Sequence, residues 1–166
     1  MKNQRMLDEL TELMRIDVSS GQETEIAEHL VKKLEQMGFA ITRDEAGATF
    51  GGVCGNILAV REGERDGVVC FCSHMDRVPG GIGIKPVEED GILRSSGDTI
   101  LAADDLSGVA AILEGVRQAI ESGKALPKLE ILFTVGEEAG LYGAKAFDVS
   151  LLTSKTMYVL DSPGRI

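Results

Sequence analysis

Short apolar runs of strand length alternate along this chain with amphipathic helical patterns. Strand-like runs lie at residues 39–42, 56–60, 68–73, 129–135 and 156–160, and apolar residues recur at helical spacing in 6–14, 26–37, 105–122 and 141–147. Alternation of this kind packs helices against a sheet around one core. We therefore predict an α/β fold with a mixed central sheet and helices on both faces. The charged turn 61–67 between two of the strands predicts a hairpin.

The second helix carries the clearest local signals. Ser20-Gly21-Gln22-Glu23 at its start predicts a capping box, in which the serine and glutamate side chains satisfy free backbone donors. Gly38 predicts a left-handed stop after the helix, as Gly123 does after the helix 105–122. His29 lies on this helix among charged residues, and we expect it to be exposed or partly covered rather than a metal ligand.

Composition excludes several classes of function. The 27 acidic and 17 basic residues give a formal charge of −10, which disfavours nucleic acid and anionic membranes as partners. The three cysteines form no CxxC pair, so neither a disulfide framework nor a cysteine zinc site is expected, and Cys70 and Cys72 are interpreted as small buried residues. With no signal-peptide core and no long apolar stretch, we expect a soluble, cytoplasmic protein.

Acidic and histidine residues stand where several of the predicted elements end or begin. The clusters are His74-Met75-Asp76, Asp104-Asp105, Glu137-Glu138 and Asp161. Functional groups of α/β proteins gather at such positions. So many negative charges at one sheet edge are costly unless cations hold them together, which indicates a metal site.

The residue types favour zinc. His74 and Asp76 are two residues apart, so the aspartate can accept the second ring N–H of the histidine. One imidazole nitrogen with carboxylate oxygens suits Zn²⁺, with Co²⁺ or Mn²⁺ as substitutes. Glu137 and Glu138 are adjacent and cannot easily face the same ion. One of them is free to bind metal while the other serves as general base toward an activated water.

The motifs resemble, in order and spacing, those of peptidase T and its relatives, which are co-catalytic zinc exopeptidases. The matching segments are Ser73-His74-Met75-Asp76, Ile100-Leu101-Ala102-Ala103-Asp104-Asp105, the run from Thr134 to Lys145, and Tyr158-Val159-Leu160-Asp161. The resemblance spans nearly the whole chain. It implies the zinc-exopeptidase (phosphorylase/hydrolase-like) catalytic fold.

The resemblance also implies roles for single residues. His74 and Asp161 correspond to ligands of one zinc, Asp104 to the carboxylate that bridges two zincs, and Glu138 to a ligand of the second. Asp76 corresponds to the partner that orients the histidine, and Glu137 to the general base. The implied reaction is the removal of an N-terminal residue from a short peptide by metal-activated water.

The chain departs from the family pattern at two points. Leu106 stands where the family motif Gly-Ala-Asp-Asp-Lys-Ala-Gly has lysine. The family's second-zinc histidine lies far downstream, after an inserted domain that commonly mediates homodimerisation. We therefore expect residues 1–166 to be the N-terminal portion of a catalytic domain, without the dimerisation domain and the C-terminal catalytic segment, and inactive by itself.

Two alternatives remain open. One is a related metal-dependent deacetylase or carboxypeptidase, or a glutamyl-aminopeptidase type of relative, with the same clusters. The other is a non-catalytic metal-binding module. Zinc titration combined with a peptide hydrolysis assay distinguishes them, because binding without turnover favours the module.

Overall fold

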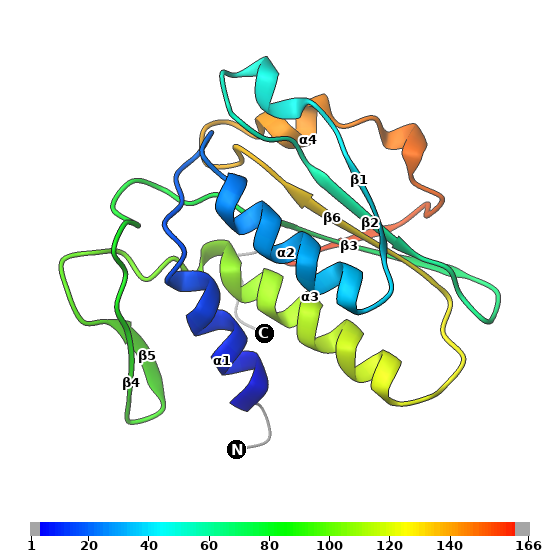
Figure 1. Cartoon of the computed structure of the whole chain (residues 1–166), viewed down its shortest axis with the longest axis horizontal. Coiled ribbons are helices and arrows are strands. Elements are labelled where there is room, and N and C mark those ends of the chain that lie inside the picture. Colours follow the sequence, from blue (N-terminus) through cyan, green and yellow to red (C-terminus); the bar gives the residue numbers. More distant parts are fainter. Residues whose placement is uncertain (1–3, 162–166) are drawn as a thin grey trace.

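The structure, a computed structural model, describes residues 4–161 (Figure 1). Its helices are α1 (Gln4–Met14), α2 (Thr24–Gln36), α3 (Ala103–Glu121) and the short α4 (Tyr142–Ala146), with 3₁₀ turns η1 (Ala46–Thr49) and η2 (Val149–Leu151). Its strands are β1 (Ala40–Arg43), β2 (Ile57–Arg61), β3 (Val68–His74), β4 (Pro86–Glu89), β5 (Ile92–Ser95), β6 (Lys128–Thr134) and β7 (Met157–Val159). The predicted alternation of helices and strands is confirmed.

The main sheet has the order β1-β2-β6-β3-β7. Strands β3 and β7 run parallel to their neighbours, whereas β2 is antiparallel to both β1 and β6. The sheet is therefore mixed, as predicted. The hairpin predicted across residues 61–67 is wrong, because β6 lies between β2 and β3 and pairs with both. A local turn between two apolar runs is not enough to pair them when a third, more fully buried strand takes the central position.

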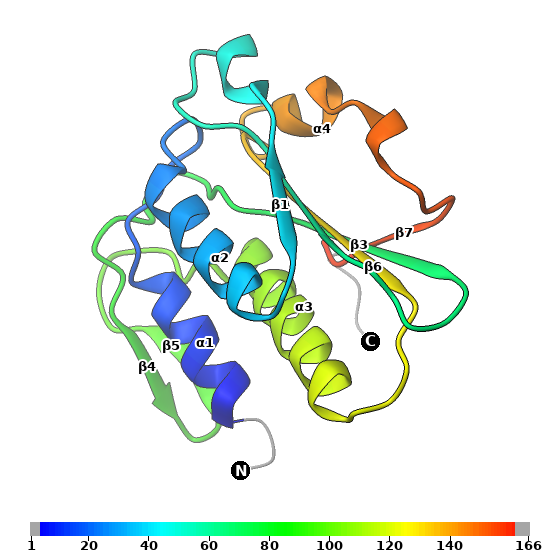
Figure 2. The same ribbon diagram turned by 45° about the vertical axis from the view of Figure 1, so that its right-hand side comes forward.

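Helices lie on both faces of the sheet, but unequally. Figure 2 shows α1, α2 and α3 on one side and the segment of α4 and η2 on the other. Side chains alternate across the strands, so Ile57, Ile131 and Phe133 join the large core beneath the long helices. Leu58 and Leu132 face the other way, into a small cluster that Phe147 covers. The second face is thus only thinly covered.

The region 79–97 holds a separate two-stranded sheet of β4 and β5, which the sequence patterns did not predict.

Burial raises the pKa of the Cys70 and Cys72 thiols to about 12, in agreement with their interpretation as small buried residues. Within residues 4–161, no helix combines the length and the apolarity that crossing a membrane requires.

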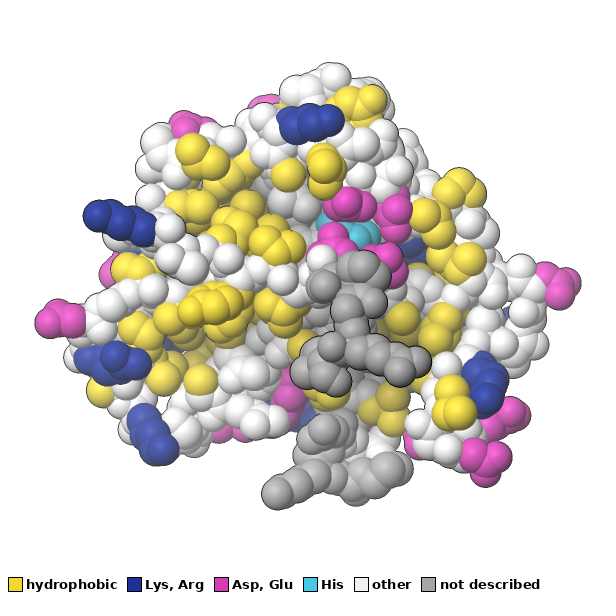
Figure 3. All heavy atoms as spheres, turned by 180° about the vertical axis from the view of Figure 1, so that it is seen from behind, with side chains coloured by type: hydrophobic (Ala, Val, Ile, Leu, Met, Phe, Trp, Pro, Cys, Tyr) yellow, Lys and Arg dark blue, Asp and Glu magenta, His cyan; other side chains and the backbone are white. Residues whose placement is uncertain are grey.

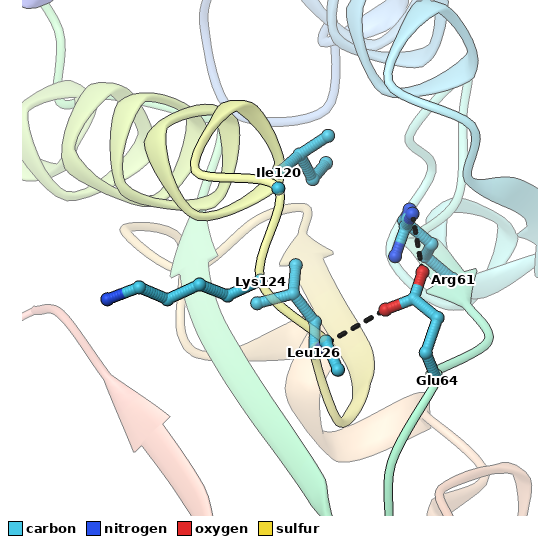
Figure 4. Close-up of a pocket in the computed structure, with 7 residues that line it drawn as sticks. Arg61, Glu64, Ile120, Lys124 and Leu126 are labelled. Atoms are coloured by element: carbon cyan, nitrogen blue, oxygen red, sulfur yellow. Dashed lines mark hydrogen bonds and ion pairs between the residues drawn. The ribbon is translucent and has the colours of Figure 1, made fainter.

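A cavity of about 380 Å³ lies at the edge of the sheet where β3 and β6 begin (Figure 4). Glu64 accepts a hydrogen bond from the Leu126 amide at 2.8 Å and pairs with Arg61 at 3.2 Å. These contacts tie the connection after β2 to the connection before β6. Because Arg61 and Glu64 already pair with each other, this cavity has no set of convergent ligands, and the predicted site residues lie at the opposite edge.

Candidate metal centre

Three parallel strands and one helix bring the predicted site residues together. His74 ends β3, Glu137 and Glu138 follow β6, and Asp161 follows β7, while Asp104 lies in the first turn of α3. The carboxyl ends of parallel strands meet at one edge of a sheet, so these side chains converge. Figure 3 shows acidic side chains gathered around a histidine on this side of the molecule, with hydrophobic side chains exposed to either side.

His74 is the centre of the group and is 2% exposed. Its Nε2 lies 3.2 Å from Asp104 Oδ1 and 3.9 Å from Glu137 Oε2. Its Nδ1 lies 3.1 Å from the backbone oxygen of Asp76 and 3.4 Å from Asp76 Oδ1. Burial alone lowers the pKa of His74, but the contacts with Asp76 and Asp104 outweigh burial and raise that pKa to about 9. The surroundings of the His74 ring therefore favour a positive charge at this position.

Two groups of potential ligand atoms share His74. The first comprises His74, Asp104 and Asp161, and the second His74, Glu137 and Glu138; within each group the ligand atoms lie within 4.8 Å of one another. Among residues 4–161, Asp104 and Glu137 pair only with the His74 ring, and neither Glu138 nor Asp161 forms an ion pair. A nitrogen with several carboxylate oxygens is a donor set that zinc accepts, so the residues present fit a metal ion.

Asp76 is completely buried and does more than the sequence patterns suggested. Its carboxylate accepts hydrogen bonds from the backbone amides of Glu137, at 2.9 Å, and Glu138, at 3.2 Å, and from the Ser20 hydroxyl. Burial by itself raises the pKa of Asp76, but these bonds and His74 keep the pKa below its ordinary value. Asp76 therefore links the histidine to the turn that carries both glutamates.

The predicted capping box at the start of α2 is wrong. Ser20 donates to Asp76, and Glu23 makes no side-chain cap bond to the helix. Glu23 Oε1 instead accepts hydrogen bonds from the Gly21 amide at 2.8 Å and the Gly136 amide at 3.0 Å. Both side chains point toward the candidate site rather than to the helix end.

The segment that carries Asp104 is fixed by its neighbour. Asp105 is buried and accepts hydrogen bonds from the Ser73 hydroxyl and, at 3.2 Å, from the Gly108 backbone amide. Burial raises the pKa of Asp105 to about 6. The peptide bond between Asp104 and Asp105 is cis. Asp105 is thus held inward while Asp104, whose side chain is 72% exposed, faces the site.

Glu137 and Glu138 are half-buried at the rim of the site. Burial raises the pKa of each above its ordinary value, His74 opposes this effect, and the surrounding carboxylates add to it. A carboxylate with a raised pKa accepts a proton more readily, which suits a general base. An apolar cavity of about 310 Å³, lined by Leu132, Phe147 and Met157 among others, opens beside His74 and Glu137.

His29 lies away from this centre and is partly covered, as expected. Together with Glu9 and Glu12 it forms a third group of potential ligand atoms. Lys33 Nζ lies 2.8 Å from Glu9 and 2.7 Å from Glu12, so an ammonium group already neutralises these carboxylates. This group belongs to the contact between α1 and α2.

A protein-family model, Peptidase family M28, matches residues 56–162. The chain belongs to peptidase family M28. This match covers the segments that hold His74, Asp104, Glu138 and Asp161, so the candidate metal centre lies within the part of the chain that defines the family. The peptidase resemblance found in the motifs is confirmed.

Similar proteins include one of known sequence and two of known structure. The chain is 38% identical to the uncharacterized protein YqjE of Bacillus subtilis over the whole of this chain and 45% of that protein. It matches aminopeptidase PepT of Bacillus cereus with a TM-score of 0.95 and 39% identity, over 99% of this chain and 44% of that one. It matches a Staphylococcus aureus tripeptidase with a TM-score of 0.92 and 34% identity, over 98% of this chain and 44% of the tripeptidase. The chain thus spans less than half the length of each of these relatives.

Proposed function

We propose that this chain carries the metal-binding part of the active site of a zinc-dependent aminopeptidase that removes N-terminal residues from short peptides. The observation that carries the proposal is the convergence of His74, Asp104 and Asp161 beside Glu137 and Glu138 at one edge of the sheet. Two structurally similar proteins, an aminopeptidase and a tripeptidase by name, support this class of substrate.

In this proposal His74, Asp104 and Asp161 would hold one zinc, and Asp104 with Glu138 would contribute to a second. Asp76, against the other ring nitrogen of His74, is the kind of partner that zinc-binding histidines ordinarily have. When bound, such ions supply Lewis-acid activation of water and of the peptide carbonyl.

The chain's own residues would perform the proton transfers and attract the substrate. Glu137 would accept a proton at its carboxylate and pass it to the leaving amine, because its pKa is raised and its backbone amide is fixed by Asp76. The net charge of −10 favours a substrate that brings a free, positively charged amino terminus.

The second metal position is short of ligands among these residues. The sequence has two histidines, and His29 lies in the contact of α1 with α2. A catalytic zinc ordinarily has three protein ligands. We propose that a further ligand comes from the additional length that the relatives have, so that residues 1–166 alone bind one zinc tightly and hydrolyse no peptide.

The first test is zinc titration of the 166-residue chain by calorimetry. We expect one tight zinc per chain in the wild type and a loss of affinity of at least about 100-fold in His74→Ala, because one of three ligands is removed. His29→Ala is the matched control and should bind zinc as the wild type does. Absence of binding, or equal losses in both variants, would contradict the proposed centre.

Activity is tested in a chimera. Residues 1–166 are joined to the part of the Bacillus cereus aminopeptidase that this chain does not span, with that aminopeptidase as positive control. We expect tripeptide hydrolysis by the chimera and none by the 166-residue chain with excess zinc. Zinc binding without turnover in the chimera would favour the non-catalytic module. Hydrolysis of acylated amino acids or of C-terminal residues would favour the deacetylase or carboxypeptidase class.

A further inference from the structure

Glu23 is a fully buried carboxylate whose position the stability of α2 does not explain. It is 0% exposed and makes no capping bond to the helix that follows it. Among residues 4–161 it pairs with no cationic side chain, and its Oε2 has no hydrogen-bond partner. Burying a carboxylate without a cation costs free energy. The hydrogen bonds that Glu23 does make therefore need an explanation other than helix capping.

The bonds of Glu23 lead to the turn after β6. Its Oε1 accepts the amide of Gly136, the residue directly before Glu137. The next two amides, of Glu137 and Glu138, both donate to Asp76. Three consecutive N–H groups are therefore held by two buried carboxylates from other parts of the chain. With these amides turned inward, the turn has little freedom to reorient.

An aromatic ring also packs against Gly136. Gly136 has a φ of +59°, and a Cβ atom there would lie 2.6 Å from Phe50 Cζ. The ring of Phe50 is itself stacked on Tyr142, at a centroid distance of 4.9 Å. Gly136 is thus in contact with both the carboxylate of Glu23 and the ring of Phe50.

We infer that Glu23 is a positioning residue, which as a hydrogen-bond acceptor fixes the Gly136–Glu138 turn and so sets where Glu137 and Glu138 lie at the metal centre. Its catalytic consequence rests on the proposed function, but the positioning itself does not. Without Glu23 the Gly136 amide loses its acceptor, and of the two buried carboxylates only Asp76 still holds amides of the turn. Partners behind the ligands of a metal centre typically change affinity or activity by about 10- to 100-fold when removed.

The test compares amide hydrogen exchange in the 166-residue chain without metal. In Glu23→Ala we expect the amides of residues 136–138 to exchange at least about 10-fold faster. Glu23→Gln keeps an oxygen acceptor and should restore exchange to near the wild-type rate. Glu23→Asp keeps the carboxylate but shortens the side chain by one methylene, so we expect it to lose the 3.0 Å contact with the Gly136 amide. It should give the same result as alanine and replaces Glu23→Ala if that variant does not fold.

Glu130 provides the matched control. It is also 0% exposed and accepts two backbone amides, of Thr153 at 2.8 Å and Ser154 at 3.0 Å. Glu130→Ala should speed exchange at residues 153 and 154 and leave 136–138 unchanged. The inference is overturned by wild-type exchange at 136–138 in Glu23→Ala and Glu23→Asp, by failure of Glu23→Gln to restore protection, or by an equal effect of Glu130→Ala.

The chimera gives the functional readout. Glu23→Ala should lower kcat by about 10- to 100-fold with KM nearly unchanged, and Glu23→Gln should restore it. An unchanged kcat in Glu23→Ala would overturn the catalytic consequence. A chimera that is inactive with wild-type Glu23 counts against the proposed function, and the exchange rates then decide the positioning role by themselves.

Discussion

At the scale of single residues, the candidate site depends on buried carboxylates that belong to neither group of potential ligand atoms around His74. Asp76, Asp105 and Glu23 each accept backbone amides or hydroxyl groups, and each fixes a neighbouring residue that does face the site. The sequence patterns identified Asp76 but assigned Glu23 to helix capping, because a serine and a glutamate three residues apart before an apolar stripe satisfy the local rule. Only the contact with Gly136, far along the chain, reveals its other use.

The residue-scale prediction separates the two adjacent glutamates. In the chimera, Glu137→Gln should lower kcat at least about 100-fold while metal content stays near that of the wild type, because an amide cannot accept the proton. Glu138→Gln should lower metal content, measured by atomic absorption, because a ligand is weakened. If the two variants lose metal and turnover in the same proportion, the roles are not divided as proposed.

At the scale of elements, the contact between α1 and α3 contains an ion-pair network. Arg5 of α1 binds both carboxylate oxygens of Glu114 at 2.8 Å, and Arg117 pairs with Glu9 at 2.8 Å. The hydrogen bond from Arg5 is the largest influence on Glu114 and lowers its pKa from 4.5 to about 2. A carboxyl group whose pKa is lower in the folded than in the unfolded state stabilises the fold at pH values above its unfolded-state pKa. This stabilisation is lost as the pH falls toward the folded-state pKa.

Glu114→Gln should therefore be less stable than the wild type at pH 7, and the difference should close between about pH 4.5 and 2. We expect a Tm lower by about 2–4 °C at pH 7, which is the shift that about 1 kcal/mol produces in a domain of this size. Glu28→Gln, which removes the exposed pair with Arg43, is the control and should shift Tm little at either pH. A difference that persists at pH 2 would contradict the network argument.

The elements also show which parts of the fold were predictable from sequence. The helices and strands with regular apolar periodicity were found because each buries one face, and the site clusters followed from strand ends at a common edge. Strand order was not predictable in the same way. The turn 61–67 has the sequence of a hairpin turn, but β6 pairs with both of the strands that it connects, β2 and β3. The pairing of β2 and β3 with β6 depends on residues far apart in the chain. The β4–β5 hairpin lacks a buried face, so its pattern is weak.

At the scale of the whole molecule, apolar side chains are exposed around β7 and on the thinly covered face of the sheet. Val149 is 72% exposed, Tyr158 56% and Val159 57%. Strand β7 lies at the end of the main sheet. An exposed apolar edge strand favours association with other chains.

We therefore expect the weight-average mass of the 166-residue chain to rise with concentration in sedimentation velocity. Val159→Lys should reduce this association, since lysine on an edge strand disfavours pairing. Val53→Lys changes a valine that is 58% exposed but lies away from β7, and should leave the association as it is. A monomer at all concentrations up to about 0.1 mM, or equal effects of the two lysines, would contradict this prediction.

The central position of β6 also determines the order in which the chain can fold as it is synthesised. When residues 57–74 have left the ribosome, β2 and β3 are complete but are not each other's neighbours in the sheet. They can take their places in the sheet only when residues 128–134 supply the strand between them. Closing such long loops is slow, and unpaired apolar strands are exposed in the meantime. The turn that presents Glu137 and Glu138 follows directly after this strand, whereas Asp161 follows β7, which joins β3 later still. The candidate metal centre can therefore be complete only after the central strands of the sheet have paired.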